Sequence, residues 1–308
     1  MRVAVVDIGS NSTRLLIADV LPHGTLTELE RRSCVTRLGD GVDSDGGLSP
    51  AAIERTCKVL AEYQTLIVAH DCESNMAVLT SAVRDATNGV AFTERVQTDF
   101  DLDARILTGE QEAQLTFLGA MSEREPSSPE PTVVIDIGGG STEFIVGHGH
   151  VAGFHVSLQA GVVRLSERHI TSDPPAPEQL QGLALDTRTI FLEGLPPQER
   201  APVTRAIAVA GTATSAAAIE LELAPYDPAR VHGHRLRLAT VELLLARLAE
   251  MTESQRREVV GLQPDRAPTI VAGMILLGEA MRAFELEEVE VSEHDILRGG
   301  ALRLAGLD

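Results

Sequence analysis

The feature of this sequence that most restricts its fold is an internal repeat. The first copy spans Val5–Ile17 and the second spans Val134–Val146. Asp, Ile, Gly, Ser and Thr occupy the same places in both copies, and in each copy a polar turn with glycine joins two apolar runs. Two apolar runs around such a turn are typical of a β-hairpin. The chain is therefore predicted to hold two related hairpins, one in each half.

The two turns are candidate phosphate-binding loops. Glycine lets a backbone come close to a ligand, and successive N–H groups with Ser or Thr hydroxyls can bind an anion. The alternative is an ordinary turn, because Gly, Asn and Ser are also the usual turn residues. The turn residues are Gly9, Ser10, Asn11 and Ser12 in the first copy and Gly138, Gly139, Gly140, Ser141 and Thr142 in the second. The presence of two copies, with Asp7 and Asp136 at equivalent places, favours the functional interpretation.

A third candidate loop follows the apolar run at residues 206–210. Gly211 and Thr212 are predicted to form a turn before an alanine-rich helix that begins near Ala216. The N-terminus of a helix presents free N–H groups and the positive end of its dipole to an anion. Capping of the helix by Thr212 or Thr214 explains the same residues equally well.

The other patterns alternate between strands and helices. A helix over residues 48–69 is predicted to be capped by Ser49, and a capping box at Thr108 is predicted to open the helix 111–121. Residues 77–82 are predicted to form a short strand, and residues 122–131, rich in proline and charge, a linker. Such alternation in two related halves predicts an α/β protein with two domains that face each other across a cleft.

Composition excludes several classes of protein. The formal net charge of −19 argues against a broad nucleic-acid surface, which needs clustered basic residues. Lys58 is the sole lysine and no Gly-Lys-Ser/Thr surrounds it, which excludes a P-loop. Three cysteines without a Cys-x-x-Cys spacing suggest neither a disulfide framework nor a thiolate zinc site. With no apolar run of signal-peptide or membrane-spanning length, we expect a cytoplasmic protein without a membrane partner.

Six motifs in order resemble one known family. They lie at residues 7–12, 80–84, 109–113, 136–143, 210–212 and 231–233, where the sequences are DIGSNS, TSAVR, GEQEA, DIGGGSTE, AGT and VHG. With these motifs the chain resembles the exopolyphosphatase and guanosine pentaphosphate phosphohydrolase (Ppx/GppA) family in its short two-domain form. The resemblance implies two duplicated ribonuclease H-like domains of the actin, Hsp70 and sugar-kinase superfamily.

The resemblance also implies a domain organisation. Domain I is expected over residues 1–121, the linker over 122–131 and domain II over 132–294. A final helix over about 295–308 is expected to pack back on domain I. The short form of the family further implies a homodimer.

Site residues follow from the same resemblance. Glu112 corresponds to the glutamate that activates the attacking water, and Arg84 to an arginine that contacts phosphate. Asp136 and Glu143 flank the second glycine loop, and such carboxylates are the ligands that Mg²⁺ or Mn²⁺ prefers. Asp7 can contribute to the metal site from the equivalent place in the first copy. From the residues alone, a helix-dipole role for Glu112, a surface salt bridge for Arg84 and turn stabilisation by the aspartates remain alternatives.

The expected activity is hydrolysis of a terminal phosphoanhydride, in which a protein positions phosphates, neutralises charge and orients water. The expected substrate is inorganic polyphosphate, and the nearest alternative is guanosine pentaphosphate. No Trp and two Tyr leave few rings to stack on guanine, which favours polyphosphate. A phosphotransferase and a non-catalytic phosphate sensor are further alternatives. Against a phosphotransferase, the sequence shows no sugar-binding signature. Against a sensor, it retains Glu112, which a protein that only binds phosphate would not need.

Overall fold

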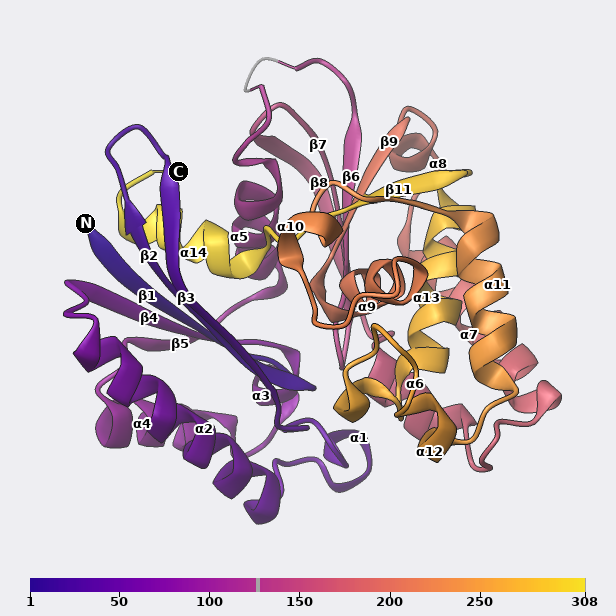
Figure 1. Cartoon of the computed structure of the whole chain (residues 1–308), viewed down its shortest axis with the longest axis horizontal. Coiled ribbons are helices and arrows are strands. Elements are labelled where there is room, and N and C mark those ends of the chain that lie inside the picture. The colour runs from indigo at the N-terminus through magenta and orange to yellow at the C-terminus, as the bar shows by residue number, and fades with distance from the viewer. Residues whose placement is uncertain (126–127, 308) are drawn as a thin grey trace. The chain divides into compact units, whose positions relative to one another are not determined.

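The computed structural model describes residues 1–125 and 128–307, and the chain forms two compact units. The first unit combines Met1–Glu123 with His294–Asp308, and the second spans Arg124–Glu293 (Figure 1). The predicted linker, residues 122–131, includes Pro126 and Ser127, which lie outside the described residues, as does Asp308 at the end of the predicted final segment 295–308.

The first unit is built on a five-stranded mixed sheet in the order β3-β2-β1-β4-β5. The first three strands form an antiparallel meander, and the last two run parallel to β1. The strands are β1 Arg2–Ile8, β2 Ser12–Val20, β3 Leu26–Val35, β4 Ser74–Leu79 and β5 Ala104–Ile106. The helices are α1 Val42–Asp45, α2 Pro50–Ala69, α3 Ser81–Asp85, α4 Gly89–Phe100, α5 Gly109–Met121 and α14 Ile296–Leu304.

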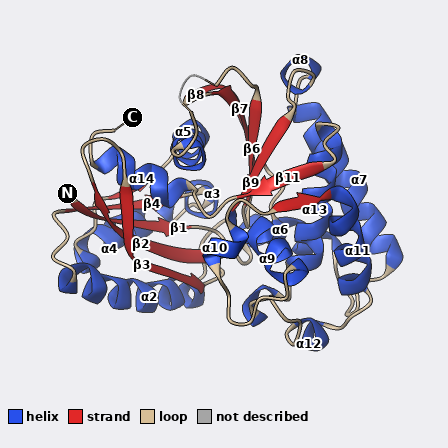
Figure 2. Ribbon diagram, turned by 45° about the horizontal axis from the view of Figure 1, so that its top comes forward, coloured by secondary structure: helices blue, strands red, loops and turns tan. Residues whose placement is uncertain are grey.

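Strand β1 shows why helices cover both faces of this sheet. Ala4, Val6 and Ile8 point to one face and pack with the apolar side chains of α2 and α4. Val3 and Val5 point to the other face and pack with α14. Because alternate side chains of a strand point to opposite faces, a strand that is apolar at nearly every position needs a cover on both sides. Figure 2 shows α2 and α4 on one side of these strands and α14 on the other.

The second unit contains a six-stranded sheet in the order β10-β11-β9-β6-β7-β8. Five of its strands repeat the arrangement of the first unit. Strands β8, β7 and β6 form an antiparallel meander, and β9 and β11 run parallel to β6. The strands are β6 Thr132–Ile137, β7 Thr142–His148, β8 Val151–Leu158, β9 Arg205–Val209, β10 Arg235–Arg237 and β11 Glu288–Val291. The predicted α/β class and its duplication are confirmed.

Helices supply most of the core of the second unit. In sequence order they are α6 Val162–His169, α7 Pro177–Gly194, α8 Pro197–Arg200, α9 Ala210–Glu220, α10 Pro228–Val231, α11 Leu238–Ala249, α12 Glu253–Arg256, a 3₁₀ turn at Pro264–Arg266, and α13 Ile270–Ala283. Nearly all of α13 is buried. Phe144 of β7 lies edge-on against Phe191 of α7 with ring centroids 4.9 Å apart, so the sheet and its helices interlock.

Several local predictions are confirmed and one is corrected. Ser49 caps α2 by accepting a hydrogen bond from the Ala52 N–H, and Thr108 forms a capping box with Gln111 at the start of α5. The strand predicted over residues 77–82 is instead β4, Ser74–Leu79, because Ser81 already begins α3. Among the described residues, no helix is long and apolar enough to cross a membrane.

Helices α5 and α14 cross at a pair of glycines. A Cβ atom on Gly119 would lie 1.9 Å from the carbonyl oxygen of Asp295, and one on Gly299 would lie 1.8 Å from that of Leu115. Both distances are far below van der Waals contact, so the two backbones touch where the side chains are missing. This crossing places Asp295, the N-cap of α14, inside the first unit.

Candidate active site

The first glycine loop is held in place while part of its backbone stays available. The Gly9 N–H donates to the Ser12 carbonyl at 3.0 Å, and the Ser10 and Ser81 hydroxyls lie 3.0 Å apart. The N–H groups of Ser10 and Asn11 donate no hydrogen bond to any other residue that the structure describes. Asn11 Oδ1 is buried and also has no partner within the described ranges. In such a loop the free N–H groups can donate to an anion, and the Asn11 amide oxygen can accept from a water bound to that anion.

Asp7, at the end of β1, lies opposite Arg14 of β2. Arg14 donates to Asp7 Oδ2 from Nε at 2.9 Å and from Nη2 at 2.6 Å, and its Nη1 donates to Asp295. The second oxygen, Asp7 Oδ1, is buried without a hydrogen-bond partner in the described part of the chain. Burial raises the pKa of Asp7 above the usual carboxyl range, although Arg14 opposes the shift. One partly buried arginine thus bridges two buried aspartates.

The second glycine loop repeats the backbone of the first. The Gly138 N–H donates to the Ser141 carbonyl at 3.0 Å. The carbonyls of Gly138 and Gly139 accept hydrogen bonds from Val162 and Val163 at the start of α6, each at 2.9 Å. The N–H groups of Gly139 and Gly140 donate to no other described residue. The helix therefore fixes the carbonyl side of this loop and leaves N–H groups for a ligand.

Asp136 and Glu143 face each other across this second hairpin, and both are buried. Glu143 Oε1 accepts hydrogen bonds from the Ser141 hydroxyl at 2.6 Å and from the Ser157 hydroxyl at 2.7 Å. Two buried carboxylates at directly opposed positions form a donor set of hard oxygens, which is the kind that Mg²⁺ binds. The residues present therefore fit a divalent cation, and the Ser157 hydroxyl holds one of the two carboxylates.

The third loop differs from its prediction. Gly211 and Thr212 do not precede a helix but belong to the first turn of α9, whose N-cap is Val209 without a side-chain hydrogen bond. The alternative of a cap at Thr212 or Thr214 is therefore excluded, and the Thr214 hydroxyl instead donates to the Ala210 carbonyl. A Cβ atom on Gly211 would lie 1.9 Å from Nη1 of Arg266, so this glycine makes room for a guanidinium against the helix end.

Glu112 lies in the first turn of α5 and is 7% exposed. Arg84, in α3, donates from Nη1 to Glu112 Oε2 at 2.9 Å and to the Leu107 carbonyl at 3.0 Å. Burial raises the pKa of Glu112 to about 7, against the opposing effect of Arg84. A carboxylate with a pKa near neutrality can take a proton from water and release it again, as a general base must.

The topology explains which predicted residues come together within each unit. Ile8 pairs with Leu79 and Leu79 with Ile106, so β1, β4 and β5 end at the same edge of the first sheet. The segments that follow these three strands carry the first glycine loop, Arg84 and Glu112. In the second sheet, Asp136 pairs with Val209, which brings the loop 138–140 and the start of α9 to one edge. Ligand sites of open α/β sheets lie at such edges.

Sequence reasoning missed several residues of these sites. Arg14, Asp295, Ser157 and Arg266 were not among the predicted site residues. When the two repeats are aligned, Arg14 occupies the position of Glu143. This reversal of charge at equivalent positions was the signal in the sequence that could have pointed to Arg14. Asp295 and Ser157 gave no comparable signal, because their contacts depend on the packing of α14 and the pairing of β8.

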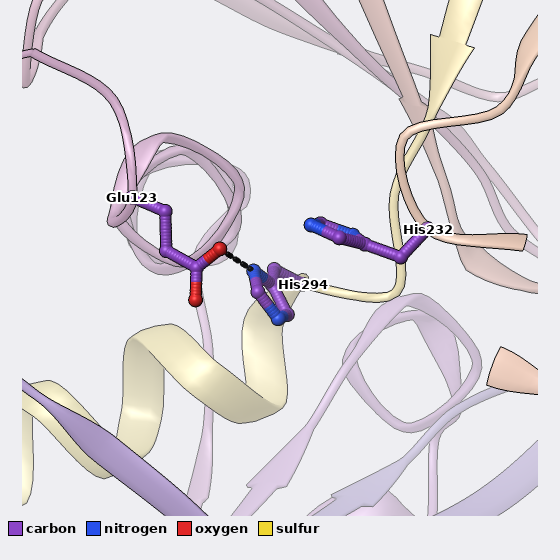
Figure 3. Close-up of side chains that lie close together, drawn as sticks. All are labelled: Glu123, His232 and His294. Atoms are coloured by element: carbon purple, nitrogen blue, oxygen red, sulfur yellow. Dashed lines mark ion pairs between the residues drawn. The ribbon is translucent and has the colours of Figure 1, made fainter. Parts of the chain in front are cut away.

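A further charged group lies where the chain leaves and re-enters the first unit. His294 Nδ1 lies 3.8 Å from Glu123 Oε2. Figure 3 marks this ion pair with a dashed line. Arg298 donates from Nη2 to Glu123 Oε1 at 3.0 Å and from Nε to the Ser122 hydroxyl at 2.6 Å. Figure 3 also labels His232, which belongs to the second unit, where its Nδ1 accepts from the Glu293 N–H at 3.3 Å.

Comparison with known proteins identifies the family. Residues 16–303 match the Ppx/GppA phosphatase family. The chain belongs to this family. It is 38% identical over 321 aligned positions to exopolyphosphatase 2 of Mycobacterium tuberculosis, and the match covers 99% of each chain.

Solved structures agree with this assignment. The crystal structure of an exopolyphosphatase-like protein superposes with a TM-score of 0.92 at 30% identity, covering 99% of both chains. The Aquifex aeolicus member of the Ppx/GppA family gives a TM-score of 0.82 at 32% identity, covering 99% of this chain and 97% of the other. The protein is thus a phosphatase of the Ppx/GppA family, as the motifs predicted.

Proposed function

We propose that this phosphatase is an exopolyphosphatase, which releases orthophosphate from the end of inorganic polyphosphate. The observation that carries the proposal is Glu112, a buried carboxylate with a pKa raised to about 7, at the sheet edge that also carries a glycine loop and Arg84. The similarity to exopolyphosphatase 2 of Mycobacterium tuberculosis over nearly the whole chain supports the same activity.

In the proposed reaction, a water oxygen attacks the terminal phosphorus while Glu112 accepts a proton from that water. The phosphoanhydride P–O bond breaks, orthophosphate leaves, and the shortened chain keeps the bridging oxygen. In the first unit, the unused N–H groups of Ser10 and Asn11 would bind phosphate oxygens. In the second unit, those of Gly139 and Gly140 and those in the first turn of α9 offer the same kind of donor. Arg84 would contact phosphate through its Nε and Nη2 atoms.

Asp136 and Glu143 would hold Mg²⁺ or Mn²⁺. Asp7 has one oxygen without a hydrogen bond from the described residues, Oδ1, which could also coordinate a divalent cation. When bound, such an ion neutralises charge on the phosphate oxygens. The protein's own part is to keep Asp136 and Glu143 in place, which the register of β6 and β7 and the Ser141 and Ser157 hydroxyls achieve.

The aromatic residues favour polyphosphate over guanosine pentaphosphate. There is no Trp, Tyr63 is buried, and six of the seven Phe side chains are buried, Phe154 being partly exposed. This leaves Tyr226 and Phe154 as rings that could stack on a guanine base. Polyphosphate has no base to stack on a ring, so the scarcity of exposed rings does not weaken its binding.

Orthophosphate release from short polyphosphate, long polyphosphate and guanosine pentaphosphate, each with Mg²⁺, tests the proposal. We expect turnover of polyphosphate, and Glu112→Gln should lower kcat by roughly 10²–10⁴-fold. Glu110→Gln is the matched control, because Glu110 lies in the same helical turn but is exposed. Turnover confined to the nucleotide would make the protein an alarmone phosphatase, and no release from any of the three substrates would contradict the hydrolase proposal.

A further inference from the structure

The hydrogen bonds of Arg84 are divided unevenly over its guanidinium group. Nη1 makes both of its bonds, to Glu112 Oε2 and to the Leu107 carbonyl. Nε and Nη2 donate to no residue within the described ranges, and the side chain is 22% exposed. Glu112 Oε1 likewise accepts no hydrogen bond from the described residues. Three N–H donors of Arg84 and one oxygen of Glu112 are therefore unused.

The backbone fixes this arrangement. Arg84 follows β4, Leu107 follows β5, and these strands are paired up to Leu79 and Ile106. The Leu107 carbonyl directly precedes the N-cap Thr108 of α5, the helix that carries Glu112. The bond to Leu107 thus ties the guanidinium to the start of the helix, so Arg84 and Glu112 keep one relative position.

The geometry of the guanidinium separates two tasks. The group is planar and its donors form a rigid fork, so atoms bonded to Nη1 and atoms bonded to the Nε/Nη2 edge have a fixed relation to each other. Nε and Nη2 together form the edge that binds two oxygens of a phosphate at once. The same group can therefore hold Glu112 on one side and a phosphate on the other.

We infer that Arg84 is a positioning residue for Glu112 as well as a phosphate contact: it holds Oε2, leaves Oε1 as the atom that takes the proton from water, and sets the distance from Oε1 to the bound phosphate. This inference rests on the proposed function and adds to it the choice of the reacting oxygen. It also predicts that Arg84 and Glu112 act as one unit in catalysis.

A double-mutant cycle tests the inference, using the full chain with short polyphosphate at saturating Mg²⁺. Lysine at position 84 keeps the positive charge but offers a single ammonium in place of the fork. We expect Arg84→Lys to lower kcat about 10²-fold with a change in KM below about threefold, because a misplaced base costs mainly the chemical step. In the Glu112→Gln background the same change should lower kcat by less than about threefold, since residues that act as a unit are not additive.

Arg95→Lys is the matched control, because Arg95 pairs with Glu54 and Asp99 on the surface of the same unit. A second variant, Arg84→Ala, tests rescue: ethylguanidinium in solution should restore part of kcat in Arg84→Ala but not in Arg84→Ala with Glu112→Gln. Circular dichroism and the melting temperature verify that each variant is folded.

Two results would overturn the inference. If Arg84→Lys lowers kcat by the same factor with Glu112 present and absent, Arg84 acts without Glu112. If the change appears in KM alone, Arg84 only binds phosphate. Failure of the proposed function looks different, because the unaltered protein would then release no orthophosphate from polyphosphate.

Discussion

The two hairpins share a backbone and differ in charge. In both, an aspartate is the last residue but one of the first strand, and it lies opposite one residue of the next strand. In both, the glycine N–H donates to the carbonyl of the serine three residues later at 3.0 Å. That side chain is Arg14 in the first copy and Glu143 in the second. Even the next strand matches, because Ser33 lies opposite Arg14 and Ser157 opposite Glu143.

This difference assigns separate tasks to the two copies. Arg14 neutralises Asp7 and joins it to Asp295 at the start of α14. Glu143 instead adds a second buried carboxylate beside Asp136 and takes two hydroxyl hydrogen bonds. Both hairpins carry the same kind of glycine loop. The difference in charge makes the first hairpin a connection to α14 and the second a candidate cation site.

The largest effect should come from giving the first hairpin the charge of the second. Arg14→Glu would leave three carboxylates together in a buried place with no cation, which should lower the free energy of unfolding by about 3–5 kcal/mol. Urea denaturation measures this. Arg2→Glu is the control, because Arg2 pairs with the half-exposed Asp19 and its replacement should change the unfolding midpoint far less. Equal midpoints for Arg14→Glu and the unaltered protein would contradict the structural task of Arg14.

Removing the charge of the second hairpin should affect activity more than stability. Glu143→Gln keeps the size of the side chain but weakens the cation site, and orthophosphate release at limiting Mg²⁺ should fall about 10²-fold. A titration with Mg²⁺ should recover part of the loss. The control is Glu130→Gln, which alters an exposed pair with Arg205. Unchanged Mg²⁺ dependence in Glu143→Gln would exclude Glu143 as a metal ligand.

The equivalent serines offer a finer comparison. Ser157→Ala removes one of two hydroxyls that hold Glu143, so the Mg²⁺ concentration for half-maximal activity should rise up to about 10-fold. Ser33→Ala changes the matching position of the first copy, where the side chain is exposed, and should leave that concentration unchanged. The same result for both variants would mean that Ser157 has no part in holding the ligand.

The smallest expected effect concerns pH. Glu112 acts as a base only when ionised, so activity should rise with pH through a midpoint near 7. The negative charge of Asp7 raises the pKa of Glu112, so Asp7→Asn should move this midpoint to lower pH. Asp19→Asn, an exposed carboxylate paired with Arg2, should not move it. If the midpoint of the pH–activity curve is unchanged in Asp7→Asn, the charge of Asp7 does not affect the pKa of Glu112.

Local physics made part of this protein predictable from its sequence. The hairpins and the caps at Ser49 and Thr108 depend on neighbours within a few residues, so pattern and residue type sufficed. The start of α9 was mispredicted because its first turn carries Gly211, which there accommodates Arg266 from a distant segment. Asp295 and Ser157 were missed for the same reason, since their partners are chosen by the packing of α14 and by the pairing of β8 with β7. The roles of Glu112, Arg84, Asp7, Asp136 and Glu143 remain predictions.

The glycine crossing of α5 and α14 has a consequence for how the molecule is made. Residues 1–123 of the first unit are synthesised before the second unit, yet Asp295 and α14 follow only after the whole second unit. Until then Arg14 lacks its second carboxylate and the face of β1 formed by Val3 and Val5 lacks its cover. The apolar face of the first sheet therefore stays exposed during synthesis, while the second unit can already fold. The first hairpin gains its last contacts only when α14 has been made.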